Sequence, residues 1–267
     1  APEGQWLLVV NTNFNTSNRV AFRGDWLEIK NAAAGFMIGR WDNWQVSNSI
    51  AHDIAHHGWG TGLNAGHHTN MGAFVDVEGY RIGCGSTAHP TCIQGIGSED
   101  VFELNDDLSF WCVRCIAHDG GERGFNNGVI NNTGMNGNHV HRYRDLISYN
   151  NGNGPMPCVG SGPHFCEGAG MQVSGNDYEN VDTIYDFVLG AITWGNYGVG
   201  IGNYTQAVME VWNASQYFNN FGRSDEGDFN PNTTSKGFRV FNSISQKANS
   251  GAAAWVITPG NASGAEP

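Results

Sequence analysis

Six short segments of the chain share one pattern, in which a strand ends at Asn or Asp, or at Arg in one copy, before small or β-branched residues. The six copies are Val46-Ser47-Asn48-Ser49-Ile50, Cys112-Val113-Arg114-Cys115-Ile116, Tyr143-Arg144-Asp145-Leu146-Ile147, Ile184-Tyr185-Asp186-Phe187-Val188, Val211-Trp212-Asn213-Ala214-Ser215 and Val240-Phe241-Asn242-Ser243-Ile244. Their fifth residues lie at 50, 116, 147, 188, 215 and 244, so the steps are 66, 31, 41, 27 and 29. A step near 30 residues is typical of the coils of a solenoid. The repeat therefore predicts an all-β solenoid.

The first coil shows how one repeat is built. It reads as three short strands, Trp26 to Asn31, Gly35 to Gly39 and Asn43 to Asn48, separated by Asn and Gly. Strands of neighbouring coils stack about 4.8 Å apart, so equivalent residues lie above one another. The equivalent turn residues are expected to be Asn48, Asp145, Asp186, Asn213 and Asn242, with Arg114 as the exception. Asn and Asp tolerate left-handed backbone angles, which suits them to these turns.

The repeat extends over most of the chain, from about residue 25 to 257. We therefore expect residues 1–267 to form a single domain and the protein to be a monomer. The step of 66 residues contains an excursion at about 58–100, which is either one coil with a long loop or two coils with a shorter one. Such excursions commonly overhang a binding face.

The Asn-ended strands and the coil length together resemble the right-handed parallel β-helix proteins of the pectate-lyase-like superfamily. The resemblance covers nearly the whole chain, but no family-specific catalytic motif accompanies it. It implies a single-stranded right-handed parallel β-helix with long loops. It also implies a secreted protein that acts on or binds a polysaccharide.

The cysteine residues and the net charge indicate in which compartment the protein works and which partners it binds. The six Cys form the close pairs Cys84 and Cys92, Cys112 and Cys115, and Cys158 and Cys166. Disulfides in an oxidising compartment are favoured over a metal site, because the one CxxC has no matching second CxxC. The chain has no basic or apolar leader at its start and no apolar run of 18 residues, so no membrane span is expected. A net charge of −12 argues against a nucleic-acid partner.

Alternation along the repeated strand predicts an exposed stripe. It turns Val46, Cys112, Tyr143, Ile184, Val211 and Val240 inward and their neighbours outward. The predicted substrate-binding residues on the outward side are Trp111, Tyr185, Trp212, Arg239 and Phe241, next to Arg142 and Arg144. Rings pack against sugars, and Arg offers a fork to a carboxylate or sulfate. The alternative is that loops cover these side chains and they pack as ordinary core.

A duplicated tetrapeptide suggests where catalysis could occur. Ile50-Ala51-His52-Asp53 recurs as Ile116-Ala117-His118-Asp119, and His and Arg are dense from the second copy to residue 144. The candidate catalytic residues are His118, Asp119, Glu122, Arg123, His139, Arg142 and Arg144. His carries protons near neutral pH, and a neighbouring carboxylate orients it. The alternative is that a solenoid merely repeats turn residues, and that His139 and His141 face inward.

Three functions are compatible with these residues. The first is a polysaccharide lyase that cleaves an acidic, uronate-containing glycan by β-elimination. Arg142 or Arg144 would neutralise the carboxylate, His118 or His139 would act as the base, and Tyr185 is a poor candidate for the acid.

The second function is glycoside hydrolysis by Asp119 paired with Glu122 or Asp145. The third is non-catalytic glycan binding. No metal ligands are assigned. Calcium is considered as a cofactor, with Asp225, Glu226 and Asp228 as the densest acidic run, although the run lacks the spacing of a known calcium loop.

Overall fold

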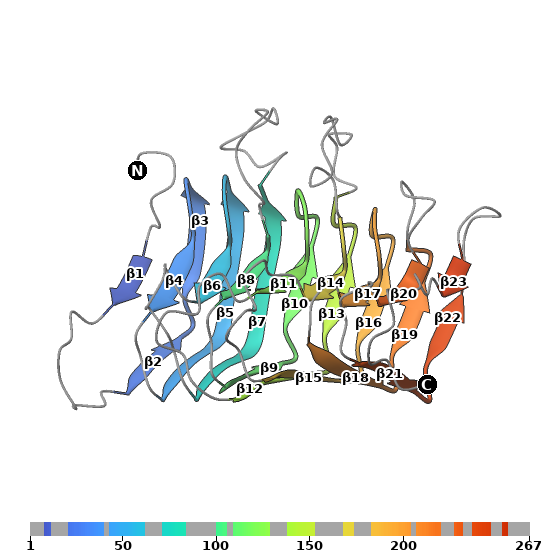
Figure 1. The fold of residues 1–267 in the computed structure, drawn as a ribbon. Coiled ribbons are helices and arrows are strands. Elements are labelled where there is room, and N and C mark those ends of the chain that lie inside the picture. The colour runs from blue at the N-terminus through green and yellow to red at the C-terminus, as the bar shows by residue number, and fades with distance from the viewer. Residues whose placement is uncertain are drawn as a thin grey trace.

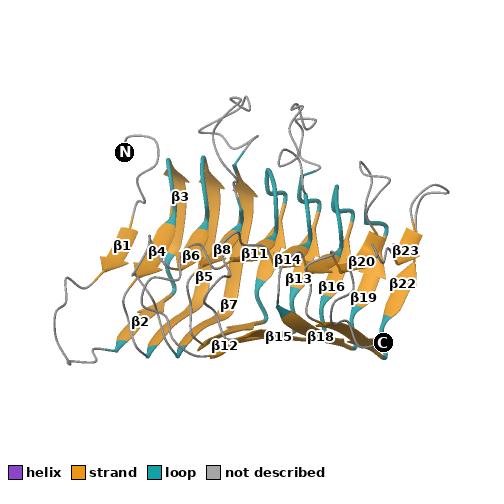
Figure 2. Ribbon diagram, viewed as in Figure 1, coloured by secondary structure: helices purple, strands orange, loops and turns teal. Residues whose placement is uncertain are grey.

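The structure is a computed structural model in which every described element is a β-strand, and every strand pairing is parallel (Figure 1). The described residues are 8–11, 21–39, 43–61, 71–83, 100–105, 109–128, 138–152, 168–173, 183–203, 207–219, 227–231, 237–246 and 253–255. Strands from successive repeats lie side by side along one axis, with the chain advancing from the N-terminal to the C-terminal end (Figures 1 and 2). The all-β arrangement of stacked parallel strands is consistent with a parallel β-solenoid, which the repeat predicts.

The strands form a 14-stranded sheet and a nine-stranded sheet. The larger sheet is bent along its length into two faces. Face 1 consists of β2 (Phe22–Asp25), the first parts of β5 (Trp44–Ile54) and β7 (Gly72–Ile82), β9 (Ser109–Val113), β12 (Asn138–Arg144), β15 (Thr183–Leu189), β18 (Val208–Trp212) and β21 (Gly237–Phe241).

Face 2 consists of β3 (Glu28–Ala32), the second parts of β5 and β7, β10 (Ile116–His118), β13 (Ile147–Tyr149), β16 (Ile192–Trp194), β19 (Ser215–Tyr217) and β22 (Ile244–Gln246). The nine-stranded sheet forms a third side. Its strands are β1 (Leu8–Asn11), β4 (Phe36–Gly39), β6 (Trp59–Thr61), β8 (Phe102–Asn105), β11 (Phe125–Gly128), β14 (Met171–Val173), β17 (Ile201–Asn203), β20 (Gly227–Pro231) and β23 (Ala253–Trp255).

The bend between faces 1 and 2 is made by one left-handed residue in each coil. These residues are Trp26, Asn48, Asp76, Arg114, Asp145, Gly190, Asn213 and Asn242, all with positive φ. The predicted turn positions are confirmed except for Asp186, whose place is taken by Gly190. Arg114 fits because its Nε and Nη2 donate to the two carboxylate oxygens of Asp76, at 2.5 and 2.6 Å, in the preceding coil.

The register predicted for the fourth copy, Ile184 to Val188, was wrong by four residues. Val188 pairs with Tyr143 and Val211, and Ile192 pairs with Ile147. Val188 therefore occupies the inward place that was predicted for Ile184. The cause is Asp186, which resembles a turn residue in sequence but is fully buried.

The 66-residue step contains two coils. Glu78 of β7 pairs with Ile50 on one side and with Ile116 on the other. The segment Phe74-Val75-Asp76-Val77-Glu78 is thus a further copy of the pattern, obscured by a Glu at its fifth position. Residues 62–70 and 84–99 lie outside the described residues, and the assignment of residues 1–267 to one domain stays a prediction.

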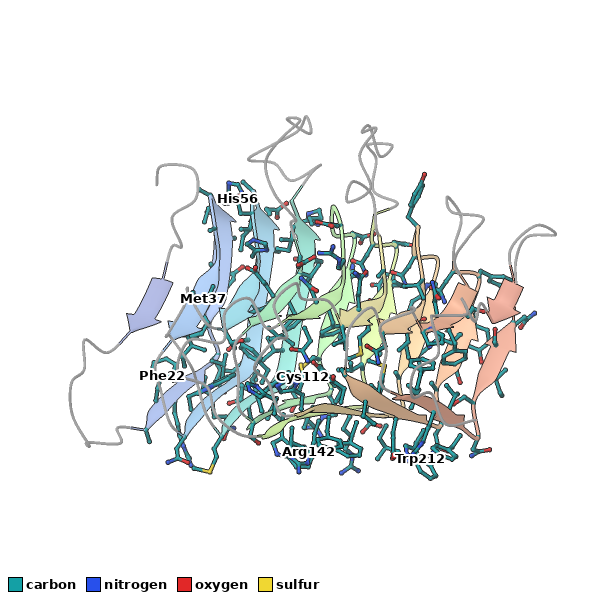
Figure 3. All side chains as sticks on the ribbon, in the orientation of Figure 1. Phe22, Met37, His56, Cys112, Arg142 and Trp212 are labelled. Atoms are coloured by element: carbon teal, nitrogen blue, oxygen red, sulfur yellow. A yellow bond between two sulfur atoms is a disulfide. The ribbon has the colours of Figure 1, made fainter. Side chains whose placement is uncertain are left out.

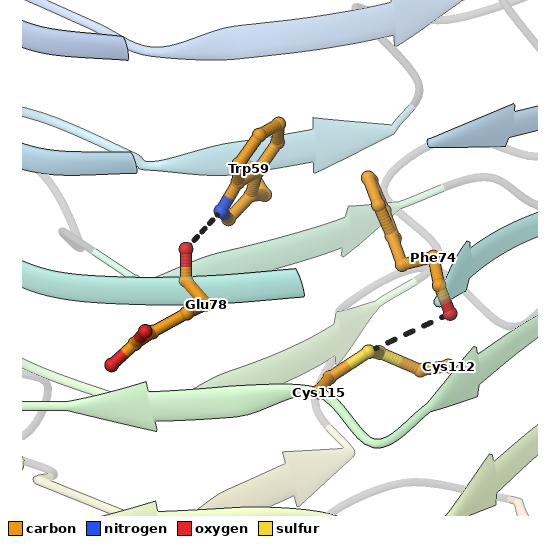
Figure 4. Close-up of a disulfide and its surroundings, with 5 residues drawn as sticks. All are labelled: Trp59, Phe74, Glu78, Cys112 and Cys115. Carbon is orange, nitrogen blue, oxygen red and sulfur yellow. Dashed lines mark hydrogen bonds between the residues drawn. A yellow bond between two sulfur atoms is a disulfide. The ribbon is translucent and has the colours of Figure 1, made fainter. Parts of the chain in front are cut away.

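Inward side chains from the three sheets fill the interior. Phe74 of face 1 contacts Trp59 and Phe102 of the nine-stranded sheet, with ring centroids 5.9 and 5.8 Å apart. The predicted Cys112–Cys115 disulfide joins two buried residues on either side of the bend, beside the Phe74 carbonyl (Figure 4). The other two predicted cysteine pairs lie outside the described residues.

A buried asparagine ladder supports the C-terminal coils. Asn151 Nδ2 donates to Asn196 Oδ1 at 3.0 Å, and Asn196 Nδ2 donates to Asn219 Oδ1 at 2.8 Å. The ladder ends at Asp228, whose Oδ1 accepts from Asn219 Nδ2 at 3.0 Å. Each amide of the ladder both donates and accepts, so these buried side chains satisfy one another across neighbouring coils.

Candidate functional site

Face 1 carries an exposed patch of rings and guanidinium groups, and Figure 3 shows Arg142 and Trp212 pointing outward from it. Strand pairing places the patch residues in two outward columns that cross five coils, from β9 to β21. We call this set the Arg–aromatic patch: Trp111, Arg142, Arg144, Phe187, Leu189, Trp212, Arg239 and Phe241. The earlier coils of the same columns carry smaller or polar residues such as Gln45, Ser47 and Ala73.

Arg142 is held in place by an aromatic ring. Its Cζ lies 5.1 Å from the centroid of the Trp111 ring in the adjacent coil, and Trp111 is 44% exposed. Among the described residues no carboxylate pairs with Arg142. Among the described residues the guanidinium is therefore oriented by a cation–π contact and not by an ion pair.

The C-terminal part of the patch is more apolar. Trp212 stacks on Phe241 with ring centroids 3.9 Å apart, and Trp212 is still 41% exposed. Arg239 Nη1 lies 3.2 Å from Glu210 Oε1, so its charge is largely balanced within the patch. Arg144 pairs with Asp145 at 3.3 Å, with both side chains exposed, which makes this a weak contact.

Tyr185 is not in the patch. It pairs with Val140 and Val208, and the outward places level with Arg142 and Arg144 belong to Phe187 and Leu189. Sequence reasoning missed these two residues because of the register error in this coil. Both are exposed, so the patch stays continuous across β15.

Face 2 carries a second ladder, in which five rings stack face to face. His52, Tyr80, His118, Tyr149 and Trp194 come from successive coils. Their centroids are 4.9, 5.1, 4.5 and 4.2 Å apart, and neighbouring planes differ by 4° to 12°. Because each ring covers the faces of its neighbours, the ladder presents ring edges rather than open faces to solvent.

The two duplicated histidines have the same surroundings. His118 Nδ1 lies 2.7 Å from Asp119 Oδ2, and its Nε2 lies 3.0 Å from Glu78 Oε1 in the preceding coil. We call this arrangement the His118 bridge. The ring is sandwiched between Tyr80 and Tyr149, and the side chain is 12% exposed.

The His52 bridge repeats this geometry two coils earlier. His52 Nδ1 lies 2.7 Å from Asp53 Oδ2, and its Nε2 lies 3.2 Å from Glu28 Oε1. Arg81 also grips Asp53, with its Nε and Nη2 donating at 2.7 and 2.5 Å. The duplicated sequence thus becomes a duplicated carboxylate–imidazole–carboxylate contact.

Neighbouring charges set the acidity of several of these groups. Hydrogen bonds from Arg81 lower the pKa of Asp53 to about 2, with His52 contributing less. Hydrogen bonds from Lys30 and His52 lower the pKa of Glu28. Burial raises the pKa of Tyr149, and the charges of Asp119 and Glu78 add to this effect.

The structure does not bring the predicted catalytic residues to one place. Glu122 and Arg123 are buried and pair with each other at 3.0 Å, and Arg123 also faces Asp100. His139 is fully buried. His141 is buried as well, as its expected inward facing requires, and contacts Asp186 at 3.1 Å.

The remaining candidates lie on two different faces. Arg142 and Arg144 are on face 1, whereas His118 and Asp119 lie at face 2, beyond the bend. An arginine and a histidine from this set therefore do not converge on one substrate atom.

The described residues contain no group of three or more His, Cys, Asp or Glu side chains that could hold a metal ion. Asp228, from the predicted acidic run, is buried and bonded to Asn219 and Ser245. Asp225 and Glu226 lie outside the described part of the chain.

Comparison with known proteins gives no relative for this chain: no family model, curated protein or solved structure matches it. No helix in the described residues is long and apolar enough to span a membrane.

Proposed function

We propose that the protein binds an extended, acidic polysaccharide along the Arg–aromatic patch of face 1. The observation that carries this proposal is Arg142, which is fixed over Trp111 without a carboxylate partner among the described residues. A preorganised guanidinium loses less conformational entropy when it binds a carboxylate or sulfate. Exposed rings on either side of it would contact the apolar surface of the sugar rings.

The shape of the patch favours a long ligand. Its two columns cross five coils, and coils are spaced about 4.8 Å apart, so the patch extends about 19 Å along the axis. The charged end, at Arg142 and Arg144, and the apolar end, at Trp212 and Phe241, would contact different parts of one chain. Exposed apolar surface on a soluble protein commonly marks such a binding site.

The finer fold assignment belongs to the same proposal. We infer a right-handed parallel β-helix of the pectate-lyase-like type, because crossovers between parallel strands of one sheet are almost always right-handed. The Cys112–Cys115 disulfide supports a secreted protein, since disulfides persist mainly in oxidising compartments. Both inferences are consistent with a polysaccharide ligand.

Binding is preferred over elimination because of where the candidate bases lie. A lyase needs a base close to the arginine that neutralises the uronate. In the described residues His139 is inside the solenoid, and both ring nitrogens of His118 face carboxylates on face 2. Neither residue is placed to accept a proton from a sugar bound over Arg142.

The test is isothermal titration with a polyuronate and with the same polymer after its carboxyl groups have been reduced. The polyuronate is expected to bind more tightly than the reduced polymer. Its affinity should fall as the salt concentration rises. Arg142→Gln should weaken polyuronate binding about 10- to 100-fold, since a hydrogen bond to a charged group contributes about 1.5–3 kcal/mol. Trp111→Ala should also weaken binding, because it removes the ring that orients Arg142.

Arg23→Gln provides the matched control. Arg23 is an exposed arginine of face 1 in the same outward column, but it lies in the first described coil, away from the patch. Equal losses for the Arg23 and Arg142 variants, or equal affinity for the reduced polymer, would refute the proposal. Following the absorbance of unsaturated uronates in the same mixtures would reveal elimination.

A further inference from the structure

We propose that the His52 and His118 bridges are proton-controlled clamps between neighbouring coils of face 2. Each clamp holds two coils together while its imidazole carries both protons, and it releases them when one proton is lost. The proposal concerns face 2 alone and does not depend on glycan binding at face 1. It rests on contacts that occur twice, in the same form, in the duplicated sequence.

The proposal depends on which nitrogen atoms of each imidazole ring can donate a hydrogen bond. Ionised carboxylates only accept hydrogen bonds, and a neutral imidazole has one donor nitrogen and one acceptor nitrogen. Both nitrogens of His118 lie within 3.0 Å of a carboxylate oxygen, and those of His52 lie within 3.2 Å. Both contacts are hydrogen bonds only in the imidazolium form. Loss of one proton sets a nitrogen lone pair against a carboxylate oxygen.

The contacts through Nε2 are the ones that join coils. Glu28 belongs to β3 and His52 to β5, whereas Glu78 belongs to β7 and His118 to β10. In contrast, Asp53 and Asp119 directly follow their own histidines in the chain. The aspartates therefore fix the ring orientation, and the glutamates tie each ring to the previous coil.

The other charged and titratable groups around the rings are consistent with this role. His52 also faces Lys30 of β3 and Tyr80 and Arg81 of β7, with Lys30 bonded to Glu28 at 2.9 Å and Arg81 to Asp53. His118 also faces Tyr80 of β7 and Tyr149 of β13. Lys30 and Arg81 lower the pKa values of Glu28 and Asp53, which keeps these two carboxylates ionised at mildly acidic pH.

The direction of the pH effect follows from these protonation states. A clamp needs ionised carboxylates and a protonated ring, so it is complete at mildly acidic pH. Its contribution to stability is present while the ring carries both protons and is lost as the pH rises and one proton leaves. The coils that bear the clamps should therefore loosen above neutral pH.

The test compares melting temperatures at about pH 5.5 and about pH 8 for the full chain and for Glu28→Gln and Glu78→Gln. Glutamine can accept from a protonated ring and donate to a neutral one, so the inter-coil contact no longer depends on pH. Each substitution should reduce the difference between the two melting temperatures by about 2–4 °C. Glu210→Gln, which removes a face 1 carboxylate paired with Arg239, should leave the difference unchanged.

A local measurement separates a clamp from a general loss of stability. Amide hydrogen exchange in β10, corrected for intrinsic rates, should accelerate with pH in the parent chain and less so in Glu78→Gln. Exchange in β18 should show no such contrast. Melting temperatures lowered equally at both pH values, or a pH dependence unaltered in both variants, would overturn the proposal. Glu28→Gln alone decides the matter if Glu78→Gln does not fold.

Discussion

Single residues decide where this chain bends. Six of the eight residues between faces 1 and 2 are Asn, Asp or Gly, which accept left-handed backbone angles at low cost. Of the two exceptions, Arg114 has a compensating contact, because its guanidinium donates two hydrogen bonds to the Asp76 carboxylate of the preceding coil. The side chains of the bends therefore also link neighbouring coils.

The Asp53–Arg81 pair should protect the protein against acid. Because the pKa of Asp53 is lowered to about 2, the pair adds stability above the ordinary aspartate range, and this is lost as the pH falls toward 2. Arg81→Gln should move acid unfolding, followed by circular dichroism, to a higher pH. Arg144→Gln, which breaks an exposed pair, serves as the control. Superimposable acid transitions for both variants would contradict the assignment.

Part of the histidine chemistry could be predicted from the sequence, and part could not. The duplication of Ile-Ala-His-Asp singled out His52 and His118 together with the aspartate beside each. Their glutamate partners were missed because Glu28 precedes its histidine by 24 residues and Glu78 precedes its own by 40. Coils of unequal length place the same contact at different sequence separations, so a fixed offset does not find it.

At the level of elements, alternation predicted which residues of β15 face inward and outward, but the register of β15 against its neighbours was wrong by four residues, an even number that leaves the facing unchanged. The segment Ile184 to Val188 matches the repeated pattern, yet the coil is anchored by Val188, Gly190 and Ile192. Asp186 misled the alignment because its buried contacts, with His141 and Asn127, come from other coils. Tertiary partners of this kind are invisible to a local pattern.

The register of β15 can be checked with two adjacent residues. Val188 is fully buried, whereas Leu189 is 42% exposed. Val188→Ala should lower the free energy of unfolding by about 2 kcal/mol, through lost burial and the cavity it leaves. Leu189→Ala should change it by less than about 0.5 kcal/mol, as is usual at exposed positions. Urea denaturation measures both, and the opposite ranking would favour the register expected from sequence.

At the scale of the whole molecule, the fold was predictable because most coils repeat the same short sequence pattern. The number of coils was not, since one copy carries Glu78 where the others carry mostly Ile. The candidate catalytic residues between 118 and 144 also do not lie together in the structure. These residues are close in sequence, but the fold distributes them over face 1, face 2 and the buried interior.

A solenoid should also lose stability locally. Each coil contacts mainly its neighbours, so stability is close to a sum of nearest-neighbour terms. Phe229→Ala, which removes a buried ring from β20, costs about 3–5 kcal/mol and should accelerate hydrogen exchange in β18 to β22 while leaving β5 unchanged. Phe36→Ala in β4 should give the reverse gradient. Uniform acceleration along the chain in both variants would show that the coils unfold as one unit.

The stacked rings of face 2 provide an intrinsic spectroscopic signal for the spacing between coils. Tyr149 and Trp194 lie parallel within 5° at 4.2 Å, close enough for their electronic transitions to couple. The near-ultraviolet spectrum of such a pair depends on the spacing between coils rather than on strand content. A slip of one winding past the next would therefore alter this signal even while the backbone signature of the sheets persisted.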